Sequence, residues 1–386
     1  MTKRRVLWEL FARMFAISAF VLGGGFAIIA VADEVFSKKL KWTEDGEIVG
    51  QLSVFQMVPG MICTNTAIYI GNKMAGCVGA AVALAGTVLP SLLVFTFVTV
   101  CYGSIPVANP YLASAFTGLR AALAGIIVAL VVRSWTKNVR GIYGYAAVVV
   151  AVMLMGWLKV SAAMVIAASA FVGIALEFAL RQFSARSGGS IVFHSSSLGF
   201  LLLFLKYGSL AFGGGYVLVP LYIEDFVGSS APFLQMTSEE FANVMALTQM
   251  TPGSISVNCA TFFGYKMYGV LGSVAATVAM VLPNYVLLLL LLHSLERFKT
   301  SSVVSGALSG IRPVTTALMV VAAWAFAGMS AWTYSSSGAV ECDFLAAVIL
   351  AASAVAVISR RLSVVQIVFA SAAVAVAGRA VLCCVQ

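Results

Sequence analysis

Residues 56–60 read Gln-Met-Val-Pro-Gly and residues 249–253 read Gln-Met-Thr-Pro-Gly, so one short motif occurs twice, 193 positions apart. Outward from this motif, further uncommon residues recur at almost the same spacing. They include Glu47 and Glu240, Asn65 and Asn258, Gly71 and Gly264, Pro90 and Pro283, and Arg120 and Arg312. Chance does not keep so many rare residues in step, and the chain is therefore predicted to be an internal duplication.

The composition places this duplication in a membrane. Of 386 residues, 61% are hydrophobic and 10% are charged, and the mean hydropathy is +1.03. A soluble domain is about 45–50% apolar and about 25% charged. These values exclude a soluble enzyme, a disordered regulator and a secreted disulfide scaffold. They predict a multi-pass protein of the cell (inner) membrane, with the lipid bilayer as its partner and no nucleic acid, because the excess of basic residues sits in short loops.

Each half has the same predicted order of segments. The first repeat is residues 1–183, the linker is 184–197, and the second repeat is 198–386. An apolar segment broken by three glycines comes first, then two short arms that meet at Pro-Gly, then four long apolar helices. The expected fold is an all-α polytopic membrane protein with about 10 transmembrane helices and two re-entrant Pro-Gly hairpins.

The hairpins follow from length. The arms are residues 47–58 and 60–73 in the first half, and 240–251 and 253–266 in the second. At about 1.5 Å per residue they reach about 18 and 21 Å, which is short of a hydrocarbon core about 30 Å thick. Pro breaks a helix and Gly frees the next turn, so each pair of arms is predicted to enter the membrane and return.

Loop charges indicate that the second repeat is inverted. Basic residues, among them Lys137, follow the helix near 112–133, whereas Glu341 and Asp343 follow its counterpart in the second half. Basic loops face the cytoplasm, so equivalent loops are expected on opposite sides of the membrane. Strict symmetry places the N-terminus outside and the basic residues near it argue for inside, which leaves its side open.

The broken helices and the Pro-Gly tips are the predicted site for a small inorganic anion, because helix N-termini present N–H groups with partial positive charge. Recurring basic residues supply further positive charge. The candidate substrate-binding residues are Gly23, Gly24, Gly25, Gly213, Gly214, Gly215, Pro59, Gly60, Thr64, Asn65, Pro252, Gly253, Ser254, Ser256, Asn258, Arg120, Arg312, Lys73 and Lys266. The alternatives are close packing for the glycines and anchoring at the lipid headgroups for the Lys and Arg side chains.

Recurring carboxylates are the candidates for proton coupling: Glu34, Glu224, Glu47 and Glu240. Their alternative role is helix capping or surface solvation. Seven Cys without C-x-x-C spacing and only two His predict no metal site. No catalytic constellation and no ATP-binding motif stands out, so we expect no cofactor and no enzymatic activity.

The chain resembles the chromate ion transporter family in its fused two-half form. The resemblance rests on the Gly-Gly motifs after Leu22 and Phe212, on both Pro-Gly elements, and on a downstream spacing of glycines and proline. In the two halves that spacing is Gly71, Gly76, Gly79, Pro90 and Gly264, Gly269, Gly272, Pro283.

The resemblance implies proton-driven export of chromate, with sulfate as a competitor. The sequence departs from the family pattern at Gly25 and Gly215, and at Met61 and Ser254, where the family often has proline. A passive anion channel of the same fold and a carrier of another substrate remain alternatives. The sequence does not decide between a monomer and a homodimer.

Inversion makes a prediction about membrane sidedness. Single cysteines introduced as Asn138→Cys and Lys299→Cys should both react with an impermeant thiol reagent from the cytoplasm, and Glu341→Cys only from outside. The measurement is labelling in intact cells and in inverted vesicles, with the native cysteines as background. Labelling of positions 138 and 341 from the same side contradicts the inverted repeat.

Overall fold

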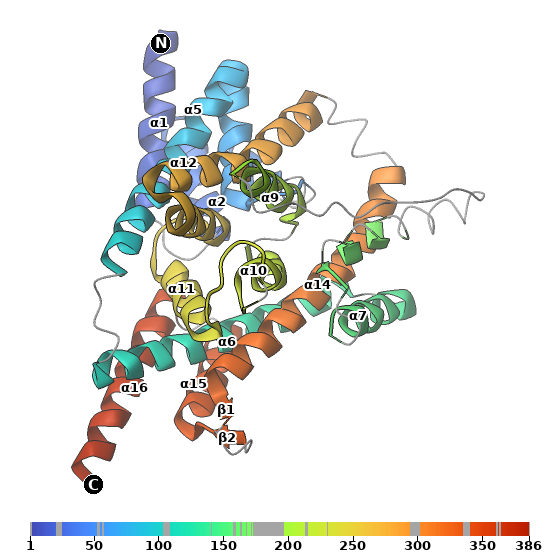
Figure 1. The fold of residues 1–386 in the computed structure, drawn as a ribbon. Coiled ribbons are helices and arrows are strands. Elements are labelled where there is room, and N and C mark those ends of the chain that lie inside the picture. Colours follow the sequence, from blue (N-terminus) through green and yellow to red (C-terminus); the bar gives the residue numbers. More distant parts are fainter. Residues whose placement is uncertain are drawn as a thin grey trace. The chain divides into compact units, whose positions relative to one another are not determined.

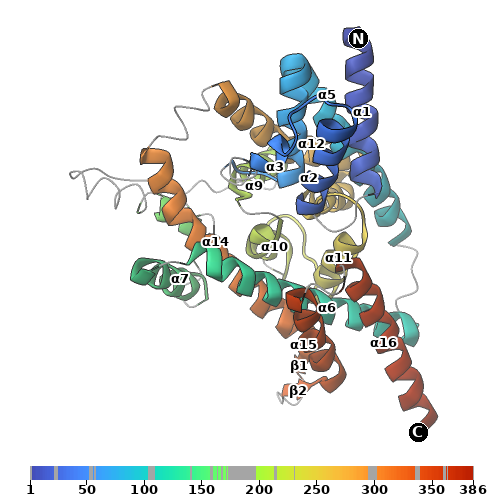
Figure 2. The same cartoon turned by 180° about the vertical axis from the view of Figure 1, so that it is seen from behind.

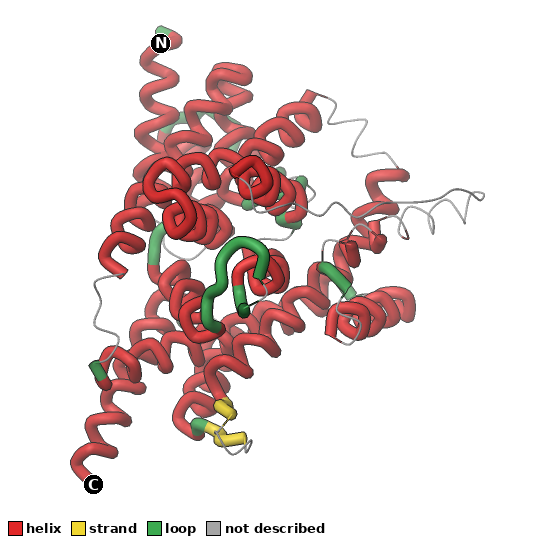
Figure 3. Tube along the Cα trace, in the orientation of Figure 1, coloured by secondary structure: helices red, strands yellow, loops and turns green. Residues whose placement is uncertain are grey.

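The computed structural model describes most of the chain. The described residues are 2–20, 25–51, 55, 58–102, 109–139, 141–156, 160–162, 164–166, 168–170, 172, 197–212, 215–229, 231–293, 302–334, 340–359, 362 and 364–385. Helices dominate these residues (Figure 3), which confirms the predicted all-α class. Two short antiparallel strands, β1 (Trp332–Tyr334) and β2 (Val340–Cys342), form a hairpin.

Four described helices are long and apolar enough to cross a membrane: Ile62–Cys101, Pro110–Thr136, Ile255–His293 and Gly306–Ser330. Shorter apolar helices occupy Gly141–Met155, Leu198–Leu210, Phe344–Ser359 and Gln366–Gly378. The polytopic prediction is therefore confirmed. The total of about ten crossings stays a prediction, as do the inversion and the re-entrant depth of the hairpins. The predicted linker, 184–197, lies outside the described residues except for its last residue.

The described helices belong to two compact units, and each unit gathers segments from both sequence repeats. The first unit holds residues 1–99, 163–218 and 251–315; the second holds 100–162, 219–250 and 316–386. Elements of the first unit are α1 (Lys3–Phe20), α2 (Gly25–Asp33), the π-helix η1 (Glu34–Lys39), α3 (Glu47–Gly50), α5 (Ile62–Tyr102, up to residue 99), α9 (Ser197–Leu210), the 3₁₀ turn η2 (Gly215–Leu218), α12 (Ile255–His293) and the start of α14 (Ser302–Ala331) (Figure 1).

Within the first unit, α5 and α12 share one unusual backbone feature. Ala75 and Gly76 leave helical geometry in α5, with Gly76 at φ 64° and ψ −155°. Tyr268 and Gly269 do the same in α12, with Gly269 at φ 62° and ψ −152°. Glycine suits this positive φ because it has no Cβ. Each apparent long helix is thus a short arm followed by a longer helix, and the break lies two to three residues after the predicted end of the arm.

The arm and the longer helix fold back upon each other through paired glycines. A Cβ added to Gly71 would collide with the carbonyl of Gly79, and one added to Gly264 would collide with the carbonyl of Gly272. In α12 the side chain of Ser273 also donates a hydrogen bond to the Thr261 carbonyl, 2.9 Å away. Small residues therefore bring the two backbones together, as in close helix packing within membranes.

The second unit is built around α6 (Pro110–Asn138), which packs against α15 (Phe344–Ser359) and α16 (Val364–Val385) (Figure 2). Glycines again allow the close approach, because a Cβ on Gly118 would collide with the Ser371 carbonyl and one on Gly125 with the Leu350 carbonyl. The unit also holds α7 (Gly141–Gly156), α10 (Val219–Phe226), α11 (Ser238–Met250), the β-hairpin and the end of α14.

The glycine contact gives a stability prediction. Gly264→Ala should lower stability by about 1–3 kcal/mol, because the new methyl group would overpack against the carbonyl of Gly272. The measurement is the thermal midpoint of the detergent-solubilised protein. Gly50→Ala is the control, since nothing lies within 4 Å of a Cβ at that position. Equal midpoints for the two variants contradict the close contact.

Candidate functional site

The first Pro-Gly element joins two segments that run antiparallel. The amide of Asn65 donates a hydrogen bond to the Phe55 carbonyl at 2.8 Å, and the Lys73 ammonium donates to the Glu47 carboxylate at 2.6 Å. The members of each pair lie equally far from Gly60 in sequence, at five residues for Asn65 and Phe55 and at thirteen for Lys73 and Glu47. The segments therefore turn at Gly60, where the sequence placed the tip.

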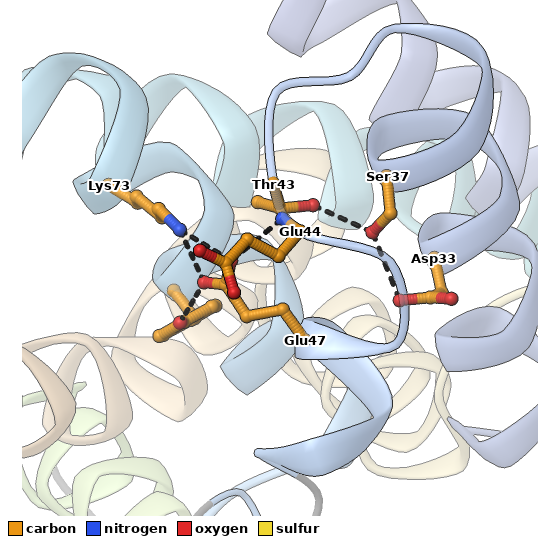
Figure 4. A network of polar contacts seen from close by, with 7 residues as sticks. Asp33, Ser37, Thr43, Glu44, Glu47 and Lys73 are labelled. Carbon is orange, nitrogen blue, oxygen red and sulfur yellow. Dashed lines mark hydrogen bonds and ion pairs between the residues drawn. The ribbon is translucent and has the colours of Figure 1, made fainter.

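Glu47 is the centre of a polar cluster beside this hairpin (Figure 4). Its carboxylate accepts hydrogen bonds from the Tyr69 hydroxyl at 2.6 Å, from the Lys73 ammonium, and from the backbone N–H of Glu44 at 2.9 Å. Desolvation by partial burial raises the pKa of Glu47, but the hydrogen bonds from Lys73, Tyr69 and Glu44 outweigh it and hold the pKa below its usual value. The ionised form of Glu47 is therefore favoured while these contacts are in place.

A second polar group lies near Glu47, and the sequence did not point to it. Asp33 is buried, and its carboxylate accepts a hydrogen bond from Ser37 at 3.0 Å (Figure 4). The Ser37 hydroxyl lies 2.7 Å from that of Thr43. Asp33 has no counterpart at the equivalent place in the second repeat, where Ile223 stands. The burial of Asp33 is not visible in the sequence, and comparison of the two repeats pointed to its neighbour Glu34 instead.

The polar residues after both tips are buried, as a site inside the protein requires. Thr64 and Asn65 are 1% and 0% exposed, and Ser256 and Asn258 are both 0% exposed. Helix α5 begins at Ile62 and α12 at Ile255, directly after the two tips. Both tips therefore carry a helix N-terminus, whose first N–H groups have no partner within the helix.

Each tip packs against a polar residue of the other repeat, and both contacts lie within the first unit. The Asn284 amide donates to the Thr64 hydroxyl at 2.6 Å, and a Cβ on Gly60 would collide with Asn284. The Ser91 hydroxyl donates to the Pro252 carbonyl at 3.4 Å, and a Cβ on Gly253 would collide with Ser91. We call Asn284 and Ser91 the seats of the tips.

The two seats occupy equivalent positions, directly after Pro283 and Pro90. Their contacts also explain why both tips have glycine, since any side chain would displace the seat. Sequence reasoning missed them. The available signal was a polar residue after a repeated proline within an otherwise apolar run.

The glycine-broken segment of the second repeat also reaches the tips. The N–H of Gly60 donates to the Ala211 carbonyl at 3.1 Å. A Cβ on Gly215 would lie 2.8 Å from the Ser256 hydroxyl. The structure thus brings Gly60, Gly215 and Ser256 to the same region. Gly25 begins α2, whereas Gly23, Gly24, Gly213 and Gly214 lie outside the described residues.

The two candidate arginines differ in their surroundings. Arg120, in α6 of the second unit, is 9% exposed. It forms an ion pair with Glu239 at 3.1 Å and donates to the Thr117 hydroxyl at 3.1 Å. Arg312, in the first unit, is exposed on α14. The repeated lysines differ as well: Lys73 pairs with Glu47, and the Lys266 ammonium lies 6.0 Å from the Phe262 ring centroid.

The other candidate carboxylates lie at element ends or on the surface. Glu34 pairs with Lys39 at 2.9 Å, and this hydrogen bond and the nearby positive charge lower the pKa of Glu34. Glu224 is exposed on α10. Glu240 lies in the first turn of α11, where its N–H donates to the Thr237 hydroxyl at 3.0 Å. That arrangement is a helix N-cap. Among the residues that the structure describes, no group of acidic, His and Cys side chains could hold a metal ion.

Comparison with known proteins identifies the duplication independently. The model of the chromate transporter family matches residues 8–174 and again residues 198–378. The chain is 26% identical over 350 residues to an uncharacterized transporter of Methanocaldococcus jannaschii, covering 84% of this chain and 85% of the relative. It is 28% identical over 311 residues to a chromate transport protein of Pseudomonas aeruginosa, covering 75% and 73%.

A further relative is a chromate transport protein of Cupriavidus metallidurans, 26% identical over 286 residues and covering 68% of both chains. No solved structure matches the chain. Two matches of one family model, one in each half, confirm the fused two-half organisation predicted from the repeated motifs. With its apolar helices and two family repeats, the chain is a multi-pass membrane protein that belongs to the chromate transporter family.

Proposed function

We propose that the chain is a secondary active carrier that exports a small oxyanion, chromate or a sulfate-like anion, across the cell (inner) membrane in exchange for protons. The observation that supports this most directly is the pair of buried polar tips in the first unit, each at a helix N-terminus. Partial positive charge and N–H donors at such ends suit an anion that has lost its water. The relatives named as chromate transport proteins favour the same substrate class.

The tips also suit a carrier because their contacts are reciprocal. Each tip packs against the opposite repeat through a single polar side chain, Asn284 or Ser91. Carriers with inverted repeats bind substrate where the repeats meet and alternate between two arrangements. As the carrier switches its accessible side, one seat contact would then lengthen and the other would shorten. In this structure the Asn284 contact is the shorter, at 2.6 Å against 3.4 Å.

Transport in proteoliposomes tests the proposal. Labelled chromate should accumulate only when a pH gradient is imposed in the coupling direction, with the membrane potential clamped by potassium and valinomycin. A protonophore should stop accumulation, and excess sulfate should compete. Protein-free vesicles are the control. Chromate flux that continues unchanged without a proton gradient identifies a passive channel instead, and absence of any oxyanion flux by folded protein contradicts the proposal.

The arginines are proposed to attract the anion, since Arg stays ionised and offers a planar set of donors. Arg120→Lys should retain part of the transport and Arg120→Gln almost none, with normal expression; Arg312 should behave likewise. Lysine keeps the charge but loses the paired donors. The measurement is initial chromate flux per amount of folded protein.

Glu239→Gln separates this role from a structural one. The Glu239 side chain is 63% exposed, so its pair with Arg120 contributes little to stability. If Arg120 attracts the anion, removal of the competing carboxylate should leave transport intact or raise it. If the ion pair itself is what matters, Glu239→Gln and Arg120→Gln should lose expression and transport together.

A further inference from the structure

At the first tip, two buried side-chain amide oxygens are left without a hydrogen-bond donor. The Thr64 hydroxyl donates to the Met61 carbonyl at 2.8 Å, so it can only accept from the Asn284 amide. The Asn65 amide donates to the Phe55 carbonyl at 2.8 Å. Both Asn side chains are 0% exposed, and neither Oδ1 atom accepts a hydrogen bond from any part of the chain that the structure describes.

The orientation of both amides is fixed by their partners. A carbonyl oxygen such as that of Phe55 cannot donate, so Asn65 must present its nitrogen to it. The Thr64 hydroxyl donates to the Met61 carbonyl, and Asn284 presents its nitrogen to that hydroxyl in this structure. Rotation of the Asn65 amide would place oxygen against oxygen. The two Oδ1 atoms are therefore the groups left without a donor, and a buried acceptor of this kind is unfavourable until it finds one.

A fully ionised oxyanion cannot satisfy these acceptors, because it carries no hydrogen to donate and its oxygens would repel them. A singly protonated oxyanion can, because its O–H donates while its remaining oxygens accept from helix N–H groups. Sites built to bind a substrate hydroxyl discriminate strongly against analogues that lack it, since the site is then left with an unpaired polar group. The two amides would thus distinguish tetrahedral anions of nearly equal size by whether the anion carries a proton.

Resting on the proposed function, we propose that the first tip takes the oxyanion in its singly protonated form, with Asn284 and Asn65 accepting the hydrogen bond of the anion's O–H. Asn284 is then a specificity-determining residue of the site. The equivalent position in the first repeat is Ser91, whose hydroxyl donates to the Pro252 carbonyl; it has no amide oxygen and so lacks this selectivity. The bound species carries one negative charge instead of two, which lowers the cost of moving it through an apolar core.

Chromate and sulfate form a matched pair of probes. Both are tetrahedral, but chromate takes up a proton near neutral pH and sulfate does not. Binding to the purified full-length protein is measured from pH 5.5 to 8.5. The apparent Kd for total chromate should rise about tenfold per pH unit once the hydrogen form is depleted, because only that fraction is competent to bind. Sulfate should bind at least about tenfold more weakly than chromate at pH 5.5, with no such slope.

Variants locate the effect. Asn284→Ser replaces an acceptor by a group that can donate, so the chromate slope should flatten and the preference over sulfate should fall about tenfold. Asn138→Ser makes the same change on α6 in the second unit and should leave both unchanged. If Asn284→Ser fails to fold, the pH series on the unmodified protein still decides.

The outcomes separate the two proposals. A chromate affinity that is independent of pH, or sulfate binding as tightly as chromate at pH 5.5, overturns the protonated-substrate proposal and leaves the carrier intact. Loss of chromate binding when choline replaces sodium also overturns it, because the acceptors would then serve a cation. Absence of binding by every oxyanion at every pH contradicts the proposed function itself.

Discussion

Within a bilayer, every backbone N–H and C=O group that leaves a helix must be covered by protein, because lipid offers no hydrogen bonds. At the Pro-Gly tips, which are predicted to be re-entrant, this constraint is strongest because Pro59 and Pro252 lie outside the helices. The tips meet it through contacts with the rest of the first unit. The Ala211 carbonyl accepts from the Gly60 N–H, and Asn284 and Ser91 lie against the two glycines. Glycine at both tips, polar seats and a broken neighbouring helix are consequences of one requirement.

Repetition made much of the backbone predictable. A residue that recurs at a constant offset is expected to serve the same geometry twice, and the breaks at Gly76 and Gly269 do fall on a repeated glycine, three residues after the predicted ends of the arms. The buried polar residues after the tips followed from the same comparison. The seats did not, because Ser91 and Asn284 are ordinary polar residues in apolar helices whose partners lie 161 and 220 positions away. Contacts of that kind depend on how helices cross, which local pattern does not encode.

The repeats share a backbone but not their chemistry. Asn284 contacts Thr64, whereas its counterpart Ser91 contacts Pro252. Arg120 pairs with Glu239, and the residue of the first repeat that corresponds to Glu239 is Gly46. Sequence reasoning treated Arg120 and Arg312 as alike because both are Arg in apolar segments. Their burial differs because the surroundings of a side chain come from other elements, and those have diverged. In a duplicated transporter, differences between the repeats are therefore where selectivity has room to evolve.

The paired glycines have a mechanical consequence. Between Gly71 and Gly79, and between Gly264 and Gly272, there is no room for even a methyl group, so arm and long helix are in backbone contact. Densely packed segments move as rigid bodies rather than deform. The long helices carry exposed apolar side chains such as Leu93 and Phe97, the surface that faces lipid in a membrane protein. Each arm and its helix are therefore expected to move as one body with lipid along one side and the tip at one end, so that a change in bilayer thickness is expected to shift the tip.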